Sequence, residues 1–409
     1  MRFYYLFILI IIIPIQSFII RNIRNLFDFS FLDQFSFNNP PSVQELFCES
    51  SIKKGVNPTS SVNLTIDPDL SWYVIGETKS FPTGRPKKYT VWGKDYVIWK
   101  DKVTHEYYAM NNDCSHKGAA LSGGYCKNYI NNTAIVCPYH GYEFAGNGSL
   151  LKVPGLTFES SHCKNQRTYP ILEKNGWIYI NTIDKEEYLK IKPEIHKSAI
   201  YGEPEAANPD FSPIFLNVIF NAYSRIVTEN SLDIMHIGFV HTFGNRQFPS
   251  PLKEIPPYTV GSPYHYRTDY DYLSGSNSFA NKLFGFKELK IQNEFVLPHT
   301  TVARILFGPF VSTVITFATP INITHSKLFV KTYRNYWKAS MYSLNPLDKI
   351  NQIIGDYFTK KIMWDTVLQD KSVIEGIRLE NADGKFNMKY DKLSNTYRTF
   401  YKKFIHRVE

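Results

Sequence analysis

The sequence predicts an α+β protein in which a small antiparallel β domain is followed by a larger domain of helices and antiparallel sheet. Short runs rich in aromatic and β-branched residues, separated by Gly and Pro at hairpin intervals, fill residues 71 to 180. Apolar β-branched stretches with Gly-Pro and Pro breaks recur between residues 215 and 337. A helical repeat of apolar residues then begins at Leu347.

Length and composition limit the function classes. A chain of 409 residues can hold two domains with their own cores. Hydrophobic residues make up 43% and aromatic residues 16%, which indicates a globular chain that buries large rings. The formal net charge is +9, but Lys and Arg are scattered among 37 acidic residues rather than gathered in a stripe. We therefore expect no nucleic-acid partner, and attraction to an anionic membrane surface fits the charge better.

Residues 1–24 form an N-terminal membrane anchor or a targeting segment. Their apolar run, residues 3–20, would span ~27 Å as a helix, which is close to the hydrocarbon thickness of a bilayer. Arg21 and Arg24 follow this run and Arg2 precedes it, which favours a cytoplasmic C-terminal body. A cleaved targeting peptide is the alternative, but no small-x-small cleavage site follows the run. We expect a single anchor with the catalytic body in the cytoplasm.

The remaining chain divides into four predicted parts. Residues 25–68 are polar and aromatic without a clear period, and they form a tether. Residues 69–183 form the small β domain, and residues 184–213, charged and Pro-containing, connect it to the second domain, residues 214–409. The predicted strands of the β domain lie at 72–75, 89–92, 96–99, 135–136 and 177–180.

The second domain begins with a strand at 215–220 and a helical stretch after it. Residues 301–321 are apolar enough to suggest a second membrane span, but interspersed Ser and Thr with a Gly-Pro break fit buried strands better. Residues 333–337 continue the sheet. The amphipathic helix that starts at Leu347 carries Asp370 near its end.

A four-ligand metal motif lies in the β domain. Cys114 and His116 form a Cys-x-His pair, and after twenty intervening residues Cys137 and His140 form a Cys-x-x-His pair. A zinc finger groups its cysteines on one loop and its histidines on the other. Here each loop offers one Cys and one His, so that two thiolates can hold one iron and two imidazoles the other. A zinc site is the alternative.

These residues resemble the Rieske [2Fe–2S] family. Rieske proteins of respiratory bc complexes carry two further cysteines that join the loops by a disulfide, and this chain has Ala119 and Tyr139 at those positions. The resemblance is therefore to Rieske ferredoxins and oxygenases. The remaining cysteines, Cys48, Cys126 and Cys163, have no framework spacing and are expected to be free thiols in a reducing compartment.

A second constellation lies within residues 229–241. At ~100° per residue, Asn230, Asp233, His236 and His241 fall on one face of a predicted helix. Two imidazoles and one carboxylate with open coordination positions form the facial triad of non-haem Fe(II) proteins that activate O₂. A zinc hydrolase would require His-Glu-x-x-His, which is absent from this stretch.

The order Cys-x-His, Cys-x-x-His and then Asn-x-x-Asp-x-x-His-x₄-His resembles the oxygenase (alpha) component of Rieske non-haem iron oxygenases. The resemblance implies that His236 and His241 bind the mononuclear Fe(II). It also implies that Asp233 bridges an iron-ligating His to a cluster His of a neighbouring subunit in a head-to-tail homotrimer. Asn230 would lie near the iron without being a firm ligand, and a helix hydrogen-bonding role is its alternative.

The third iron ligand must come from far along the chain. Asp365, Asp370 and Glu375 are the candidates on the last long helix. The family places its Asp in a Gln/Glu-Asp-x-x-x-Val/Leu-Glu context, which Gln369-Asp370 followed by Glu375 resembles, so Asp370 is selected. Asp365 and Glu375 are interpreted as solvated charges on an exposed face.

The resemblance implies an enzyme that uses O₂ and electrons from a reductase or ferredoxin, with NAD(P)H as the indirect source, to monooxygenate or desaturate an apolar organic molecule. Membrane-anchored relatives include sterol desaturases and the pheophorbide a oxygenase group, so a large cyclic substrate is expected. The chlorophyll branch typically carries Cys-x-x-Cys near its C-terminus, and this chain has no Cys after Cys163. The alternative is a membrane protein that uses the cluster for electron transfer or redox sensing without oxygenase turnover.

Overall fold

The computed structural model describes residues 63–66, 71–130, 132–155, 164–191, 200–338, 346–383 and 388–408. These residues belong to one compact unit, Ser61–Glu409. The predicted anchor, residues 1–24, lies outside the described residues, as does most of the predicted tether. Among the helices of the described residues, none combines the length and the apolar character that crossing a bilayer requires.

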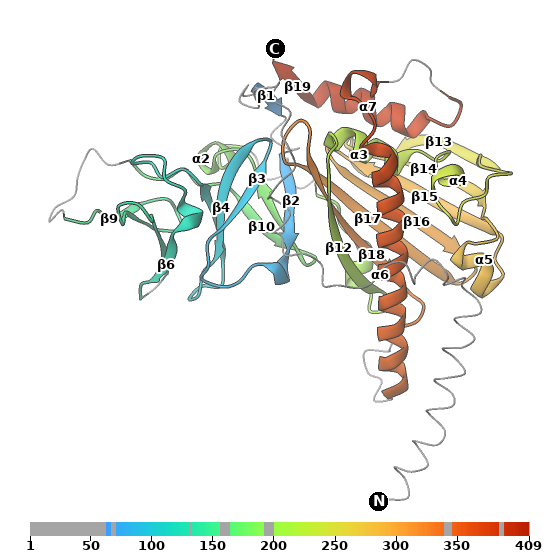
Figure 1. Ribbon diagram of the computed structural model, residues 1–409, viewed down its shortest axis with the longest axis horizontal. Coiled ribbons are helices and arrows are strands. Elements are labelled where there is room, and N and C mark those ends of the chain that lie inside the picture. The colour runs from blue at the N-terminus through green and yellow to red at the C-terminus, as the bar shows by residue number, and fades with distance from the viewer. Residues whose placement is uncertain are drawn as a thin grey trace, which may run out of the picture. The chain divides into compact units, whose positions relative to one another are not determined.

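The first domain consists of three small antiparallel sheets (Figure 1). One sheet has the order β3-β4-β5, the second β10-β11-β2 and the third β6-β7-β8-β9. The strands are β2 (Trp72–Glu77), β3 (Lys87–Val91), β4 (Lys94–Lys100), β5 (Tyr107–Asn111), β6 (Tyr125–Asn128), β7 (Thr133–Val136), β8 (Glu143–Phe144), β9 (Leu150–Lys152), β10 (Ile171–Lys174) and β11 (Trp177–Asn181).

The strand β4 separates two apolar cores of this domain. Tyr96 and Ile98 pack into one cluster of buried side chains, whereas Val97 and Trp99 pack into another. Because successive side chains of a strand point to opposite faces, a continuous apolar run can serve two cores at once. The second of these cores includes the cluster cysteines Cys114 and Cys137.

The second domain is built on a seven-stranded antiparallel sheet of order β12-β18-β17-β16-β15-β14-β13. Its strands are β12 (Ser212–Phe220), β13 (Lys253–Thr259), β14 (His265–Leu273), β15 (Glu288–Val296), β16 (Thr300–Phe307), β17 (Phe310–Pro320) and β18 (Ser326–Arg334). The short helices are α2 (Lys185–Tyr188) in the connection, α4 (Ile237–Val240) and α5 (Phe279–Phe284). A two-stranded sheet pairs β1 (Asn63–Ile66) with β19 (Ile405–Val408).

Three longer helices pack on this sheet. The helix α3 (Ser224–Leu232) contacts strands β15 to β18, and α6 (Pro346–Ile374) contacts β12 and α3. The helix α7 (Lys392–Phe404) contacts α3, β13 and β14. Figure 1 shows α6, in orange-red, as the longest helix beside the sheet.

The predicted α+β fold is confirmed. The apolar stretch 301–321 forms the central strands β16 and β17, and the helix predicted from Leu347 is α6. The predicted strand at 333–337 is correct only at its beginning, because β18 ends at Arg334. The domain boundaries drawn from the sequence stay a prediction.

A hairpin tip joins the two domains. The β3–β4 turn consists of Trp92 and Gly93. Both residues have positive φ (52° and 76°), which a two-residue type I′ hairpin turn requires. Their backbone amides donate to the carbonyl oxygens of Pro320 (3.0 Å) and Ile321 (2.6 Å) in the second domain. The Trp92 ring lies 6.1 Å from that of Tyr223, the residue that precedes α3. The first domain is thereby held against the start of α3.

Candidate metal centres

The first predicted cluster loop folds tightly around Cys114. The Cys114 amide donates to the carbonyl oxygen of Ala119 (2.9 Å), and the Gly118 amide donates to the carbonyl oxygen of Cys114 (2.8 Å). Gly118 has a φ of +72°, a conformation that side chains with a Cβ rarely adopt. The turn brings His116 to the surface while the Cys114 side chain points into the core.

The second loop has the same backbone construction. The Cys137 amide donates to the carbonyl oxygen of Tyr142 (2.8 Å), and the Gly141 amide donates to the carbonyl oxygen of Cys137 (3.1 Å). Gly141, like Gly118, lies four residues after its cysteine and has a positive φ, +69°. The histidine follows its cysteine by two residues in the first loop and by three in the second.

The four predicted cluster ligands come together between these loops. Cys114 and Cys137 are 4% and 3% exposed, and the ring centroids of His116 and His140 are 4.8 Å apart. Burial, with the adjoining Cys137 thiol, raises the pKa of Cys114 to about 11. Two buried cysteines beside two histidines fit a group that supplies positive charge and binds thiolates and imidazoles, as a [2Fe–2S] cluster does.

Gln166 supports the first loop, and sequence reasoning missed it. This side chain is only 5% exposed, and its Oε1 accepts a hydrogen bond from the Ser115 amide (2.9 Å). Its Nε2 donates to the carbonyl oxygens of Asn111 (2.9 Å) and Asp113 (2.7 Å). Gln166 is far from the loop in sequence, and no local pattern distinguishes it from a surface glutamine.

The second site consists of His236, His241 and Asp370. Their ligand atoms all lie within 4.8 Å of one another. The two Nε2 atoms are 3.1 Å apart, and each lies 3.4 Å from Asp370 Oδ1. His236 immediately precedes α4, His241 immediately follows it, and Asp370 lies in α6, so the structure brings the two histidines together with a carboxylate more than a hundred residues further along the chain.

The single helix predicted through residues 230–241 is wrong. The helix α3 ends at Leu232, and Asp233 has extended backbone angles (φ −77°, ψ 124°). The Asp233 carboxylate accepts hydrogen bonds from the amides of Met235 (2.8 Å) and His236 (3.3 Å). Such local bonds from Asp compete with helix continuation, so the chain turns here and begins α4 in a new direction.

The same turn orients His236. Its Nδ1 lies 2.8 Å from the backbone carbonyl oxygen of Asp233, to which it donates, so Nε2 is left as the free ligand atom. The side chain of Asn230 contributes no hydrogen bond to the three-residue site in the described part of the chain. Its backbone carbonyl accepts a bond from the Asp233 amide (3.2 Å).

Gln369 orients His241 in a similar way. The Nδ1 of His241 lies 3.1 Å from Gln369 Oε1, and its ring stacks on Phe243 with a centroid distance of 4.8 Å and an interplanar angle of 14°. His241 is 7% exposed, so its ring has little freedom. The sequence showed Gln369 only as the neighbour of Asp370, and its contact with His241 follows from the packing of α6 beside α4.

The chemistry of these three side chains fits a divalent transition-metal ion. Asp370 Oδ1 is buried and has no hydrogen-bond partner, although it faces two imidazole nitrogens. At His236, burial lowers the pKa but Asp370 and Asp233 outweigh it, so the pKa is raised. At His241, burial together with the charge of His236 outweighs Asp370, so the pKa is lowered. An ion bound by both imidazoles and the carboxylate would satisfy the orphaned oxygen.

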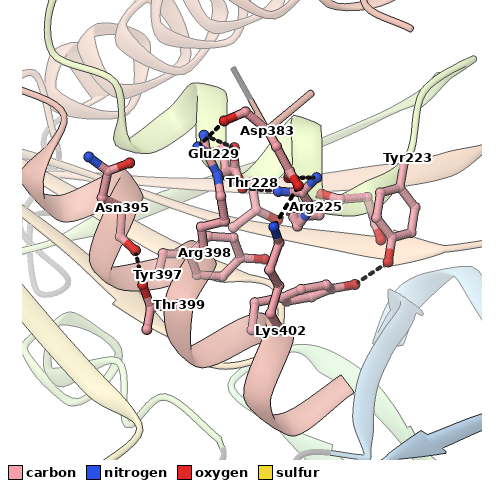
Figure 2. A network of polar contacts seen from close by, with 12 residues as sticks. Tyr223, Arg225, Thr228, Glu229, Asp383, Asn395, Tyr397, Arg398, Thr399 and Lys402 are labelled. Carbon is pink, nitrogen blue, oxygen red and sulfur yellow. Dashed lines mark hydrogen bonds and ion pairs between the residues drawn. The ribbon is translucent and has the colours of Figure 1, made fainter. Parts of the chain in front are cut away.

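A partly buried ionic network contacts α3 (Figure 2). Glu229 accepts bonds from Arg225 (2.8 Å) on the same helix and from Nε and Nη2 of Arg398 (3.1 and 2.8 Å) on α7. Asp383 pairs with Arg225 (2.9 Å) and with Lys402 (2.5 Å). Because Asp233 and His236 follow directly after α3, this network fixes the helix from which they extend.

Comparison with known proteins agrees with this geometry. Residues 71–169 match the Rieske [2Fe-2S] domain family. Pheophorbide a oxygenase of Oryza sativa subsp. japonica is 24% identical over 353 residues, which cover 80% of this chain and 61% of that protein. The oxygenase component of 3-ketosteroid-9-alpha-monooxygenase of Rhodococcus rhodochrous is 24% identical over 205 residues, 50% of this chain and 49% of that protein. The chain thus spans between about half and three-fifths of the length of these relatives.

Solved structures show the same fold. Dicamba monooxygenase bound to dicamba superimposes with a TM-score of 0.65 at 17% identity, covering 83% of this chain and 98% of that one. Pseudomonas putida CBB5 NdmA with caffeine gives a TM-score of 0.64 at 17% identity, with 82% and 90% covered. The chain therefore carries a Rieske [2Fe–2S] domain followed by a second domain; it is homologous to the two oxygenases named above and shares the fold of these solved structures.

Proposed function

We propose that this chain is the oxygenase component of a Rieske non-haem iron system, which uses O₂ and externally supplied electrons to monooxygenate or desaturate an apolar cyclic substrate. One observation carries the proposal: His236, His241 and Asp370 converge within 4.8 Å in a chain that also has the paired cluster loops. A Rieske protein that only transfers electrons has no need of a second site of this composition.

The chain's own residues have distinct tasks in this scheme. A cluster bound by Cys114, His116, Cys137 and His140 would supply electrons one at a time, and Fe(II) held by the second site would supply O₂ activation. The Asp233 carbonyl and Gln369 keep the Nδ1 protons of His236 and His241 in place, so that both Nε2 atoms stay available as ligands.

The names of the relatives and structural neighbours support an apolar cyclic substrate. The relatives and structural neighbours are named for pheophorbide, 3-ketosteroids, caffeine and dicamba, all of which contain rings.

Electron delivery is proposed to involve partners. A reductase or ferredoxin, supplied by NAD(P)H, would dock at the surface where His116 is exposed and His140 is partly exposed. We further propose a head-to-tail homotrimer in which Asp233 links the iron site of one subunit to the cluster of its neighbour. Asp233 suits this role because its backbone carbonyl already holds His236.

A membrane location remains part of the proposal. The apolar run at residues 3–20 and the arginines after it support a single N-terminal anchor, with the catalytic body on the cytoplasmic side. Protease protection of the full chain in sealed vesicles, compared with a chain lacking residues 1–24, tests this location. Extraction of the full chain by high salt alone would rule the anchor out.

The first test is iron and acid-labile sulfide content, with an EPR spectrum of the dithionite-reduced, anaerobically purified protein. We expect about three irons and two sulfides per chain and a Rieske-type signal. Oxygen uptake coupled to conversion of a cyclic substrate, screened from sterols onward, then establishes turnover. Two irons and two sulfides per chain, with an iron content that added Fe(II) does not raise, would favour the electron-transfer alternative. Zinc without sulfide would reject both the oxygenase and the electron-transfer functions.

A further inference from the structure

The outward face of α6 is apolar. The side of this helix that packs on the protein buries Gly355, Thr359, Val367 and Ile374. The side chains on the opposite face are large, apolar and open to solvent. They are Ile350 (42% exposed), Ile353 (67%), Ile354 (37%), Tyr357 (60%), Trp364 (43%) and Leu368 (42%), which we call the α6 stripe.

The spacing of the α6 stripe makes it one continuous surface. At ~100° per residue, its members fall within an arc of ~100° on one side of the helix, with Lys361 among them, and they extend over ~27 Å. A surface helix ordinarily presents polar residues to water, and a contiguous exposed apolar surface marks an interaction site. The exposed Lys349 and Lys360 lie along one border of the stripe.

We propose that the α6 stripe lies against an anionic lipid surface. Isoleucine and leucine side chains suit the acyl region, and tyrosine and tryptophan rings favour the headgroup boundary. Lysines at the border complement lipid phosphates, and the formal charge of the whole chain, +9, has the same sign. Asp365 is the opposing charge on this side, and Lys361 pairs with it (3.3 Å).

Lys361 favours lipid over a second copy of the chain as the occupant. Its ammonium group lies in the middle of the stripe, where a protein–protein contact would bury it together with Asp365 at a large desolvation cost. At a bilayer the long lysine side chain can instead extend toward the headgroups and stay hydrated. The stripe therefore suits a surface that is apolar within and charged at its boundary.

The stripe and the metal site share α6. Asp370 follows Leu368 by two residues and therefore lies on the other side of this helix, so lipid contact along the stripe would place the iron site about one helix diameter, ~10 Å, from the bilayer surface. An apolar substrate dissolved in the membrane could then reach the enzyme without crossing water. The lipid contact itself does not depend on the proposed oxygenase function, and it is tested without turnover.

Trp364 provides the test. The chain has six tryptophans, none in residues 1–62, so an N-terminal anchor contributes no signal. Trp72, Trp99 and Trp177 are buried at 8% exposure or less. The full chain is bound to vesicles of phosphatidylcholine and phosphatidylserine with brominated acyl chains, and tryptophan quenching is compared with that in unbrominated vesicles.

We expect clear quenching in the native chain and loss of most of it in Trp364→Phe, a variant that preserves the apolar ring. Ile353→Glu should at least halve the quenching, whereas Leu172→Glu, on the exposed face of β10 in the first domain, should leave it unchanged. The visible spectrum of the cluster verifies folding of each variant.

Quenching that persists in Trp364→Phe, or that is absent from the native chain, would overturn the proposal. Crosslinking between chains through Ile353→Cys, equally efficient with and without vesicles, would overturn it in favour of a second copy. Either result leaves the iron and sulfide measurements untouched, so the two proposals fail independently.

Discussion

The two candidate metal centres are constructed in different ways. The cluster loops repeat one backbone construction, with a cysteine, a left-handed glycine four residues later and two amide hydrogen bonds, all within short segments. The second site combines the two histidines that flank α4 with Asp370 of α6, and a carbonyl and a glutamine side chain orient the histidines. One centre is thus specified locally by the backbone, whereas the other depends on how distant elements pack.

The largest expected effect is the selective loss of the cluster or of the mononuclear iron when one ligand of that site is replaced. Cys137→Ser should abolish the visible absorption and sulfide of the cluster, because a thiolate ligand is lost. Asp370→Asn should keep the cluster spectrum but reduce iron from about three to about two per chain, because the buried carboxylate oxygen is lost. Iron and sulfide analysis beside the spectrum measures both. If Asp370→Asn bleached the cluster, the two sites would not be separate.

Gln369→Leu should have the next largest effect. Without the acceptor at His241 Nδ1, the ring is less firmly oriented, and metal affinity of the second site should fall by about 10- to 100-fold. Titration of the iron-depleted second site with Co(II), followed by its absorption spectrum, measures this affinity. Gln369→Glu should restore it, and Ser372→Ala, exposed on the same helix, should not alter it. Equal affinities in Gln369→Leu and the native chain would remove Gln369 from the site.

Alanine substitutions of Gly118 and Gly141 distinguish the cost of backbone strain from the cost of steric crowding. Alanine at Gly118 meets no atom within 4 Å, so it should cost only the left-handed conformation, about 1–2 kcal/mol. Alanine at Gly141 would also lie 3.0 Å from Pro154 and should cost more. Thermal unfolding followed by loss of cluster absorbance ranks the two variants. The reverse order would mean that the loops differ in rigidity despite their matching hydrogen bonds.

The smallest expected effect is the pH dependence of stability that Asp383 contributes through the ionic network at α3. The hydrogen bond from Lys402 and the charge of Arg225 lower the pKa of Asp383. Since the folded-state pKa lies below the unfolded one, this contribution to stability is present at neutral pH and is lost as the pH falls below ~4. Asp383 is half exposed, so we expect only a few tenths of a kcal/mol.

Urea unfolding at pH 7 and near pH 3.5 measures this effect. Asp383→Asn should have a lower free energy of unfolding than the native chain at pH 7. Near pH 3.5 the difference between the two free energies should be smaller. Asp210→Asn, which removes a surface ion pair with Lys338, serves as control and should narrow less. A difference for Asp383→Asn that stays constant with pH would exclude a carboxylate contribution.

The sequence predicted what is local. The spacing of Cys114, His116, Cys137 and His140 indicated the cluster loops because all four ligands lie within one stretch. Asp370 could be selected only through resemblance to a family, since nothing in its own segment distinguishes it from Asp365. The strands were predictable because buried antiparallel strands rich in β-branched residues leave a clear pattern.

What could not be predicted depends on contacts between distant segments. The helical period through residues 230–241 was misleading because the Asp233 side chain bonds to its own backbone and stops the helix. Gln166 and Gln369 act through single hydrogen bonds that arise only after packing. Their roles leave no periodic or spacing signal in the chain.

The hairpin tip at Trp92 has a consequence for engineering. Because Trp92 and Gly93 bond to the backbone of Pro320 and Ile321, and Thr319 Oγ1 donates to the Val74 carbonyl (2.5 Å), the two domains share a seam rather than a flexible joint. A chimera that exchanges the first domain for that of a relative must therefore inherit a matching tip. Without a matching tip, the exchanged first domain could fold correctly but would not form these hydrogen bonds with the second domain.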